Sequence, residues 1–275
     1  MTTRVPVNGI EIVYESMGSP DGRPLLLIMG LGAQLIHWDD DLCRLLAEQG
    51  HHVVRYDNRD AGLSTHLPQA GDPPYLLEDM ADDAAGLLDA LGWDRAHIVG
   101  ASMGGMIAQA LAIRHPDRVL TLTSIMSTPG PSISPPTEAA LAVLMSVPPS
   151  EREALIEHEL HTWSIIGSPG FPLDRERIAW MTGTAYDRAW DPDGTGRQLA
   201  AIMASPDRTE ALAGLRMPTL VIHGEDDQLV PLAGGQATAA AVPGARLLTF
   251  PGMGHDFPRP LWPEIVGAIT KHTAG

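Results

Sequence analysis

The apolar residues of this chain fall into short continuous runs, separated by segments of helical periodicity. Continuous apolar runs are typical of strands that are covered on both faces of a sheet. Six such runs lie at 24–29, 52–56, 96–99, 119–125, 218–222 and 246–250. Apolar residues recur at helical spacing between them, as at 36–49, 76–91 and 104–113. This alternation predicts an α/β fold with a mostly parallel, doubly wound sheet.

Two segments depart from the alternation. Residues 4–7 and 10–15 alternate between polar and apolar around Asn8-Gly9, a pattern typical of a β-hairpin. From about Ser127 to Leu215 no buried strand pattern occurs, whereas helical periods continue. We therefore expect a core at 1–129 and 216–275, with an inserted helical lid at 130–215. Most of the large apolar residues of this lid should pack against the core, and others should line a pocket: Trp163, Trp180, Met181, Trp190 and Met203.

Composition narrows the classes of protein. The chain has 275 residues, of which 44% are hydrophobic, enough for a sizeable core. Its formal net charge of −16 argues against nucleic acid or an anionic membrane as a partner. No signal-peptide pattern and no apolar run of membrane-spanning length is visible, so a cytoplasmic protein is expected. The oligomeric state stays open, with a homodimer as one option.

Two further features are expected to be structural. Cys43 is the only cysteine and lies in an apolar helical stretch, so it should be a buried small hydrophobe. Asp79, Asp82 and Asp83 lie between the apolar positions of the helix at 76–91 and should form its solvated face.

The most informative residues are Gly100-Ala101-Ser102-Met103-Gly104, which read G-x-S-x-G between a predicted strand and a predicted helix. A serine on such a sharp turn projects its hydroxyl above the sheet edge, where a substrate can reach it. Serine is a poor nucleophile at neutral pH, so it needs a base and a carboxylate that orients the base. Ser102 is therefore a candidate nucleophile.

Residues that could supply the base and the carboxylate follow the last two predicted strands. Asp227 comes three residues after Gly224, and His255 lies in a glycine-rich loop after the next strand. The carboxyl ends of parallel strands share one edge of the sheet, so these residues can meet Ser102 there. Asp226 is the alternative acid. His223 should be a structural residue at its strand end.

Two backbone N–H groups are needed to hold the oxyanion that forms during acyl transfer. The first is that of Met103, which follows the nucleophile. The second is expected in the glycine turn after the first apolar run, at Leu31, with Gly32 as the alternative. A metal site is a weaker hypothesis: His158 and His161 share a helix face but lack zinc-protease spacing and a third ligand.

The chain resembles the α/β-hydrolase-fold serine hydrolases over nearly its whole length. Five motifs carry the resemblance: 29–32, 56–64, 100–104, 224–231 and 252–255. Met29 stands where these proteins commonly have a histidine, and Asp60 stands where they commonly have a glycine. Both departures are similar to the branch that contains aclacinomycin-type methylesterases. The resemblance implies ester hydrolysis.

These observations predict a serine carboxylesterase that hydrolyses small to medium apolar or aromatic esters through an acyl-enzyme, without cofactor or metal. Its partner would be a small-molecule ester. A cofactor-free perhydrolase or haloperoxidase and a carbon–carbon bond hydrolase use the same three residues and remain alternatives. An epoxide hydrolase or dehalogenase would need an aspartate at position 102. A non-enzymatic binding protein would be expected to have lost one of the three residues.

Overall fold

A computed structural model describes residues 2–68 and 73–274. Within them an eight-stranded sheet has the order β1-β2-β4-β3-β5-β6-β7-β8. The strands are β1 (Thr3–Val7), β2 (Ile10–Met17), β3 (Arg23–Ile28), β4 (His51–Tyr56), β5 (Ala96–Ala101), β6 (Val119–Ile125), β7 (Thr219–Gly224) and β8 (Arg246–Phe250). From β4 to β8 all neighbouring strands are parallel. The predicted α/β fold with a mostly parallel sheet is confirmed.

The expected hairpin joins β1 and β2. Its turn residues Asn8 and Gly9 have φ values of 49° and 83°. Two successive positive φ values match a type I′ turn, the form that fits the right-handed twist of the flanking strands. The hairpin then pairs antiparallel with β4. The remaining strands end at one common edge of the sheet, where the candidate residues follow β3, β5, β7 and β8.

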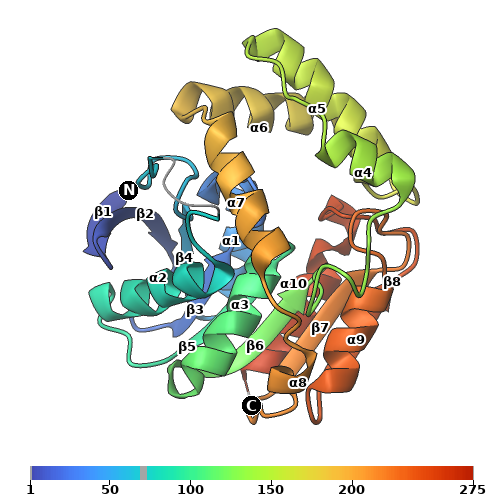
Figure 1. Cartoon of the computed structure of the whole chain (residues 1–275). Helices are drawn as coiled ribbons and strands as arrows, with labels where there is room; N and C mark the ends of the chain where they lie inside the picture. Colours follow the sequence, from blue (N-terminus) through green and yellow to red (C-terminus); the bar gives the residue numbers. More distant parts are fainter. Residues whose placement is uncertain (1, 69–72, 275) are drawn as a thin grey trace.

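Helices cover both faces of the sheet (Figure 1). One face packs against α2 (Leu77–Ala90) and α3 (Met103–Arg114), and the other against α1 (Asp40–Glu48) and α10 (Trp262–Thr273). Alternate residues of β3 show why a continuous apolar run is needed, since Leu26 points into the first layer and Leu27 into the second, both fully buried. Among the described helices, none is long and apolar enough to span a membrane.

The helix expected at 36–49 is shorter than predicted. A 3-10 turn, η1 (Leu35–His37), comes first, and α1 begins only at Asp40. Asp39 is the reason, because its carboxylate accepts the Asp41 N–H at 2.6 Å and caps the helix. Other short elements are η2 (Pro116–Arg118), η3 (Arg259–Leu261) and the core helix α9 (Ala233–Ala241).

The described stretch between β6 and β7 contains helices and no strand. These are α4 (Glu138–Leu144), α5 (Arg152–Ile166), α6 (Arg175–Arg188), α7 (Pro192–Ala204) and α8 (Thr209–Leu212). Figure 1 shows α4, α5 and α6 above the sheet and α7 descending from them toward the core. We call residues 130–215 the lid segment. Its position above the carboxyl edge brings it over the candidate residues.

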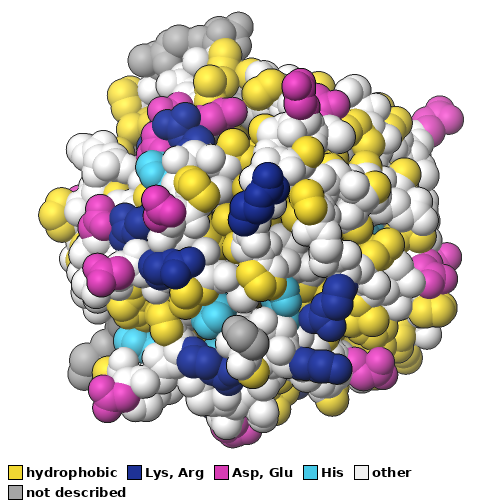
Figure 2. Space-filling view, turned by 90° about the horizontal axis from the view of Figure 1, so that it is seen from below, with side chains coloured by type: hydrophobic (Ala, Val, Ile, Leu, Met, Phe, Trp, Pro, Cys, Tyr) yellow, Lys and Arg dark blue, Asp and Glu magenta, His cyan; other side chains and the backbone are white. Residues whose placement is uncertain are grey.

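Basic side chains gather on the face opposite the lid segment, despite the negative net charge (Figure 2). Arg23 begins β3, Arg95 directly precedes β5, and Arg246 begins β8. In a parallel α/β sheet the helices run back to this edge and end there, and cations are stabilised near helix C-termini. The fold itself therefore accounts for this basic face.

Candidate active site

Ser102 occupies a tight turn between β5 and α3. Its backbone has φ 58° and ψ −122°, a conformation that costs about 1–3 kcal/mol for a residue with a side chain. Glycines on either side allow the turn, because a Cβ on Gly100 would lie 2.0 Å from the Gly104 carbonyl oxygen. The Ser102 N–H donates to the Ile125 carbonyl at 2.9 Å and holds the turn against β6. Neighbouring structure therefore holds Ser102 in this strained backbone conformation, as is common at functional sites.

The three residues singled out in the sequence form one hydrogen-bonded series. His255 Nε2 lies 2.9 Å from Ser102 Oγ, and His255 Nδ1 lies 2.7 Å from an Asp227 carboxylate oxygen. The other Asp227 oxygen accepts the N–H groups of Leu229 and Val230, both at 2.9 Å. A neutral imidazole with its proton on Nδ1 satisfies every partner, since Nε2 is then free to accept the serine hydroxyl.

The neighbours of Asp227 have supporting contacts. Asp226 accepts the Gly252 N–H at 2.8 Å and so joins the loop after β7 to the loop after β8. His223 is fully buried, and its Nε2 donates to the Val230 carbonyl at 2.7 Å. Burial lowers the pKa of His223 and keeps the imidazole neutral. Both residues brace the loops that carry Asp227 and His255.

The lid segment holds the His255 loop directly, which sequence reasoning did not anticipate. The His255 N–H donates to the Ile166 carbonyl at the end of α5, at 2.8 Å. Ser168 accepts the Gly254 N–H at 2.8 Å and donates its hydroxyl to Asp256. Burial raises the pKa of Asp256 above the usual range of a carboxyl. These contacts join residues about 90 positions apart, so no local pattern could reveal them.

The glycine turn after β3 lies directly beside the serine. A Cβ on Gly30 would be 3.1 Å from Ser102 Cβ. The Gly32 N–H donates to the Gln198 side chain at 2.8 Å and is thus engaged with the lid segment. Leu31 is therefore the candidate donor from this turn. Met103 is the first residue of α3, so its N–H has no partner within the helix.

The loop after β4 is tied to the lid segment through Asp57. This buried carboxylate accepts the N–H groups of Leu35 and Leu63, at 2.7 and 2.9 Å. Arg188 from α6 pairs with it at 2.8 Å. Arg188 also donates to the Gln34 amide oxygen at 2.7 Å. One lid arginine thus contacts both the loop after β4 and the segment that follows the glycine turn.

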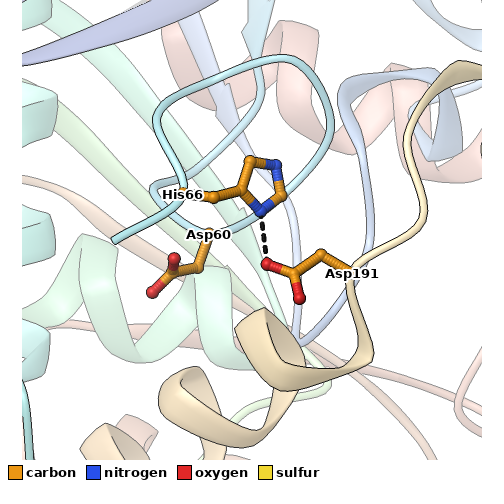
Figure 3. Close-up of side chains that lie close together, drawn as sticks. All are labelled: Asp60, His66 and Asp191. Atoms are coloured by element: carbon orange, nitrogen blue, oxygen red, sulfur yellow. Dashed lines mark hydrogen bonds and ion pairs between the residues drawn. The ribbon is translucent and has the colours of Figure 1, made fainter. Parts of the chain in front are cut away.

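Asp60, the residue that replaces the common glycine, also has a partner in the lid segment. It has a positive φ of 64° and lies near His66 and Asp191 (Figure 3). Ligand atoms of these three residues lie within 4.8 Å of one another, an arrangement that could suit a metal ion. However, Arg197 Nη2 lies 2.8 Å from Asp60 and 3.0 Å from Asp191, so a guanidinium supplies the positive charge.

The other candidate residues lie outside this site. Burial raises the pKa of the Cys43 thiol to about 12, so Cys43 is inert as a nucleophile. Its predicted burial is confirmed. His158 Nε2 lies 3.3 Å from Ser146 Oγ, while His161 is exposed. Among the described residues neither histidine belongs to a group with three metal-ligand side chains.

The prediction that Asp83 lies on the solvated face of α2 is wrong. This carboxylate is only 2% exposed and binds Arg59 through two hydrogen bonds of 2.6 and 2.8 Å. Arg59 follows β4 and reaches the helix from the loop that carries Asp57 and Asp60. A charge spaced like a surface residue was buried because a cation from a distant loop covers it.

The packing expected for the large apolar residues of the lid is also partly wrong. Met181 is buried, with 7% of its surface exposed, whereas Trp180 and Met203 are 59% and 67% exposed. Trp180 lines a surface cavity of about 350 Å³ with Arg177 and Arg259, away from Ser102. The lid helices arch above the core, so their outer faces have no second layer to cover them.

The fold agrees with comparisons to known proteins. Residues 23–165 match the family described as alpha/beta hydrolase fold, and residues 198–260 match one described as TAP-like protein. The chain belongs to the α/β-hydrolase fold family. A rhodomycin D methylesterase from Streptomyces sp. (strain C5) is 30% identical, with 99% of this chain and 98% of the relative covered. Such relatives support a hydrolase.

Two further similarities show the range of the family. A non-heme haloperoxidase from Rhodococcus erythropolis is 28% identical over 90% of both chains. The crystal structure of an enol-lactonase from Burkholderia xenovorans LB400 superimposes with a TM-score of 0.77 and 26% identity, covering 99% of this chain and 100% of the other. The fold class is therefore shown, whereas the names of the similar proteins refer to different reactions.

Proposed function

We propose that the protein is a serine carboxylesterase that hydrolyses apolar or aromatic carboxylic esters. The observation that carries the proposal is the series Asp227–His255–Ser102, with distances of 2.7 and 2.9 Å. A methylesterase and a lactonase among the similar proteins point to the same class of bond. A methyl ester on a polycyclic aromatic acid is the first substrate to test.

In the proposed reaction, His255 Nε2 takes the proton of Ser102 while Oγ attacks the ester carbonyl. The N–H groups of Leu31 and Met103 hold the oxyanion. His255 then protonates the departing alcohol, and water hydrolyses the acyl-enzyme by the same steps. Asp227 keeps the imidazole in the correct tautomer and stabilises its charged form. No cofactor or metal is needed for any of these steps.

The nucleophile can be tested by comparing Ser102→Ala with Ser164→Ala, which changes an exposed lid serine. Wild type and Ser164→Ala should hydrolyse p-nitrophenyl and aromatic methyl esters, and each should gain one label from a serine-directed phosphonate, measured by intact mass. Ser102→Ala should lose nearly all activity and take no label. A labelled Ser102→Ala variant would disprove the assignment.

A perhydrolase is the second candidate, because a haloperoxidase is among the relatives. It uses hydrogen peroxide in place of water as the second nucleophile, on the same acyl-enzyme. Formation of peracid from acetate and peroxide at a higher kcat/KM than ester hydrolysis would favour it.

A further inference from the structure

Gln198 is a fully buried amide on α7 that joins two loops of the core. Its oxygen accepts the Gly32 N–H at 2.8 Å, and its nitrogen donates to the Arg59 carbonyl at 2.7 Å. The first loop follows β3 and contains the turn beside Ser102. The second follows β4. A single lid side chain thus connects the turn to the rest of the carboxyl edge.

The turn beside Ser102 has the geometry of a type II β-turn. Gly30 to Ala33 form a β-turn closed by a 3.3 Å hydrogen bond, with a φ of 65° at Gly32. Positive φ at the third position is typical of a type II turn. Type I and type II turns differ mainly in the orientation of the central peptide group, here that between Leu31 and Gly32. The hydrogen bond to Gln198 is available in only one orientation.

We propose that Gln198 is a positioning residue for ester hydrolysis. Through the Gly32 N–H it anchors the peptide group that directly follows Leu31, and together with the hydrogen bond from Ala33 to Gly30 this fixes the position of Leu31, whose own N–H serves the oxyanion in the proposed reaction. This inference rests on the proposed function, because it assigns Leu31 the task of an oxyanion donor. The start of α7 also lies close to this turn, since a Cβ on Gly32 would lie 2.8 Å from Thr195 Oγ1. The start of α7 therefore packs against the turn that Gln198 contacts.

The proposal predicts a particular kinetic effect. An oxyanion donor acts only when charge develops, so its misplacement lowers kcat and leaves KM nearly unchanged. Losing one donor costs about 100-fold to 1,000-fold. A displaced donor should cost less, and we expect kcat to fall about 10-fold to 100-fold.

Gln198→Met removes both hydrogen bonds and keeps the side-chain length. The matched control is Gln109→Met, because Gln109 is also fully buried and its amide binds Ser124 and Arg208 rather than the turn. Gln198→Glu is the conservative variant, since burial favours its neutral carboxyl, which accepts the Gly32 N–H and donates to the Arg59 carbonyl. For each variant we would measure Tm, kcat, KM and the inhibition constant of a methyl trifluoromethyl ketone. Ser102 Oγ adds to this ketone and its proton passes to His255, which gives a stable hemiketal oxyanion.

The proposal expects Gln198→Met to lower kcat and to weaken ketone binding by similar factors, with KM changed less than 3-fold. Gln109→Met should lower Tm comparably but keep kcat within about 3-fold, and Gln198→Glu should retain more activity than Gln198→Met. Equal kcat in the two methionine variants, or less activity in Gln198→Glu than in Gln198→Met, would overturn it. If Ser102→Ala hydrolysed esters normally, the proposed function would fail first. An inactive Ser102→Ala with a fully active Gln198→Met would reject the positioning role alone.

Discussion

Removing the charge of Arg197 should destabilise the protein far more than a surface ion pair would. The Asp60 carboxylate is 0% exposed and the Arg197 side chain 10% exposed. They share two hydrogen bonds of 2.8 and 3.0 Å. In Arg197→Met, Asp60 would stay buried and would lose both hydrogen bonds to Arg197, while the Leu67 N–H would still donate to it at 2.7 Å. Breaking a buried pair in this way costs about 3–5 kcal/mol, and the surviving N–H bond places the expected loss near 3 kcal/mol.

A double-mutant cycle separates this charge effect from lost packing. Asp60→Gly removes the carboxylate and relieves the positive φ of 64°. The double variant should therefore be about 2 kcal/mol more stable than Arg197→Met alone. Urea unfolding at neutral pH measures the free energies, and Tm should fall by roughly 5 °C in Arg197→Met. If the two changes were additive, Asp60 would not be a stranded charge and the reasoning would be wrong.

Three other outcomes follow from the structure. Asp227→Asn should lower kcat by about 10⁴-fold, because the amide favours the wrong imidazole tautomer. Asp226→Asn should lower kcat much less, since the Asp226 side chain contacts only the neighbouring loop. A larger loss of kcat in Asp226→Asn than in Asp227→Asn would make Asp226 the acid. Burial lowers the pKa of His97 from 6.5 to about 4. Between these two pH values the unfolded chain binds more protons than the folded chain, so the free energy of unfolding decreases as the pH is lowered from 6.5 to about 4. His97→Asn should remove on the order of 3 kcal/mol of this acid-induced loss, measured by urea unfolding at pH 7 and pH 4. EDTA should leave esterase activity unchanged, because Arg197 already neutralises the one candidate metal cluster of the described residues.

The strands of the sheet could be predicted well, because strands that are buried on both faces consist of continuous runs of apolar residues. Each continuous apolar run became a parallel strand, and Asn8-Gly9 became the expected turn. The meeting of Ser102, Asp227 and His255 could be predicted as well, because parallel strands all end at one edge. What was predicted here followed from local pattern combined with one topological rule.

Several features that the sequence could not decide depend on distant parts of the chain. The burial of Asp83 depends on Arg59, and the choice between Leu31 and Gly32 depends on Gln198, 166 positions from Gly32. Neither partner can be identified from spacing, because an arginine or glutamine at the right place in space can come from anywhere in the chain. The exposure of Trp180 has the same origin, since it depends on how far the lid helices stand above the core.

The counter-ions of two buried carboxylates in the core come from the lid segment. Arg188 neutralises Asp57, and Arg197 neutralises Asp60. Lid and core therefore cannot be recombined freely, although the lid is one continuous insertion. A lid grafted from a relative without both arginines would strand two negative charges in the core. An exchange of segments that aims to change specificity would therefore have to transfer the loop around residues 57–60 together with residues 188–198.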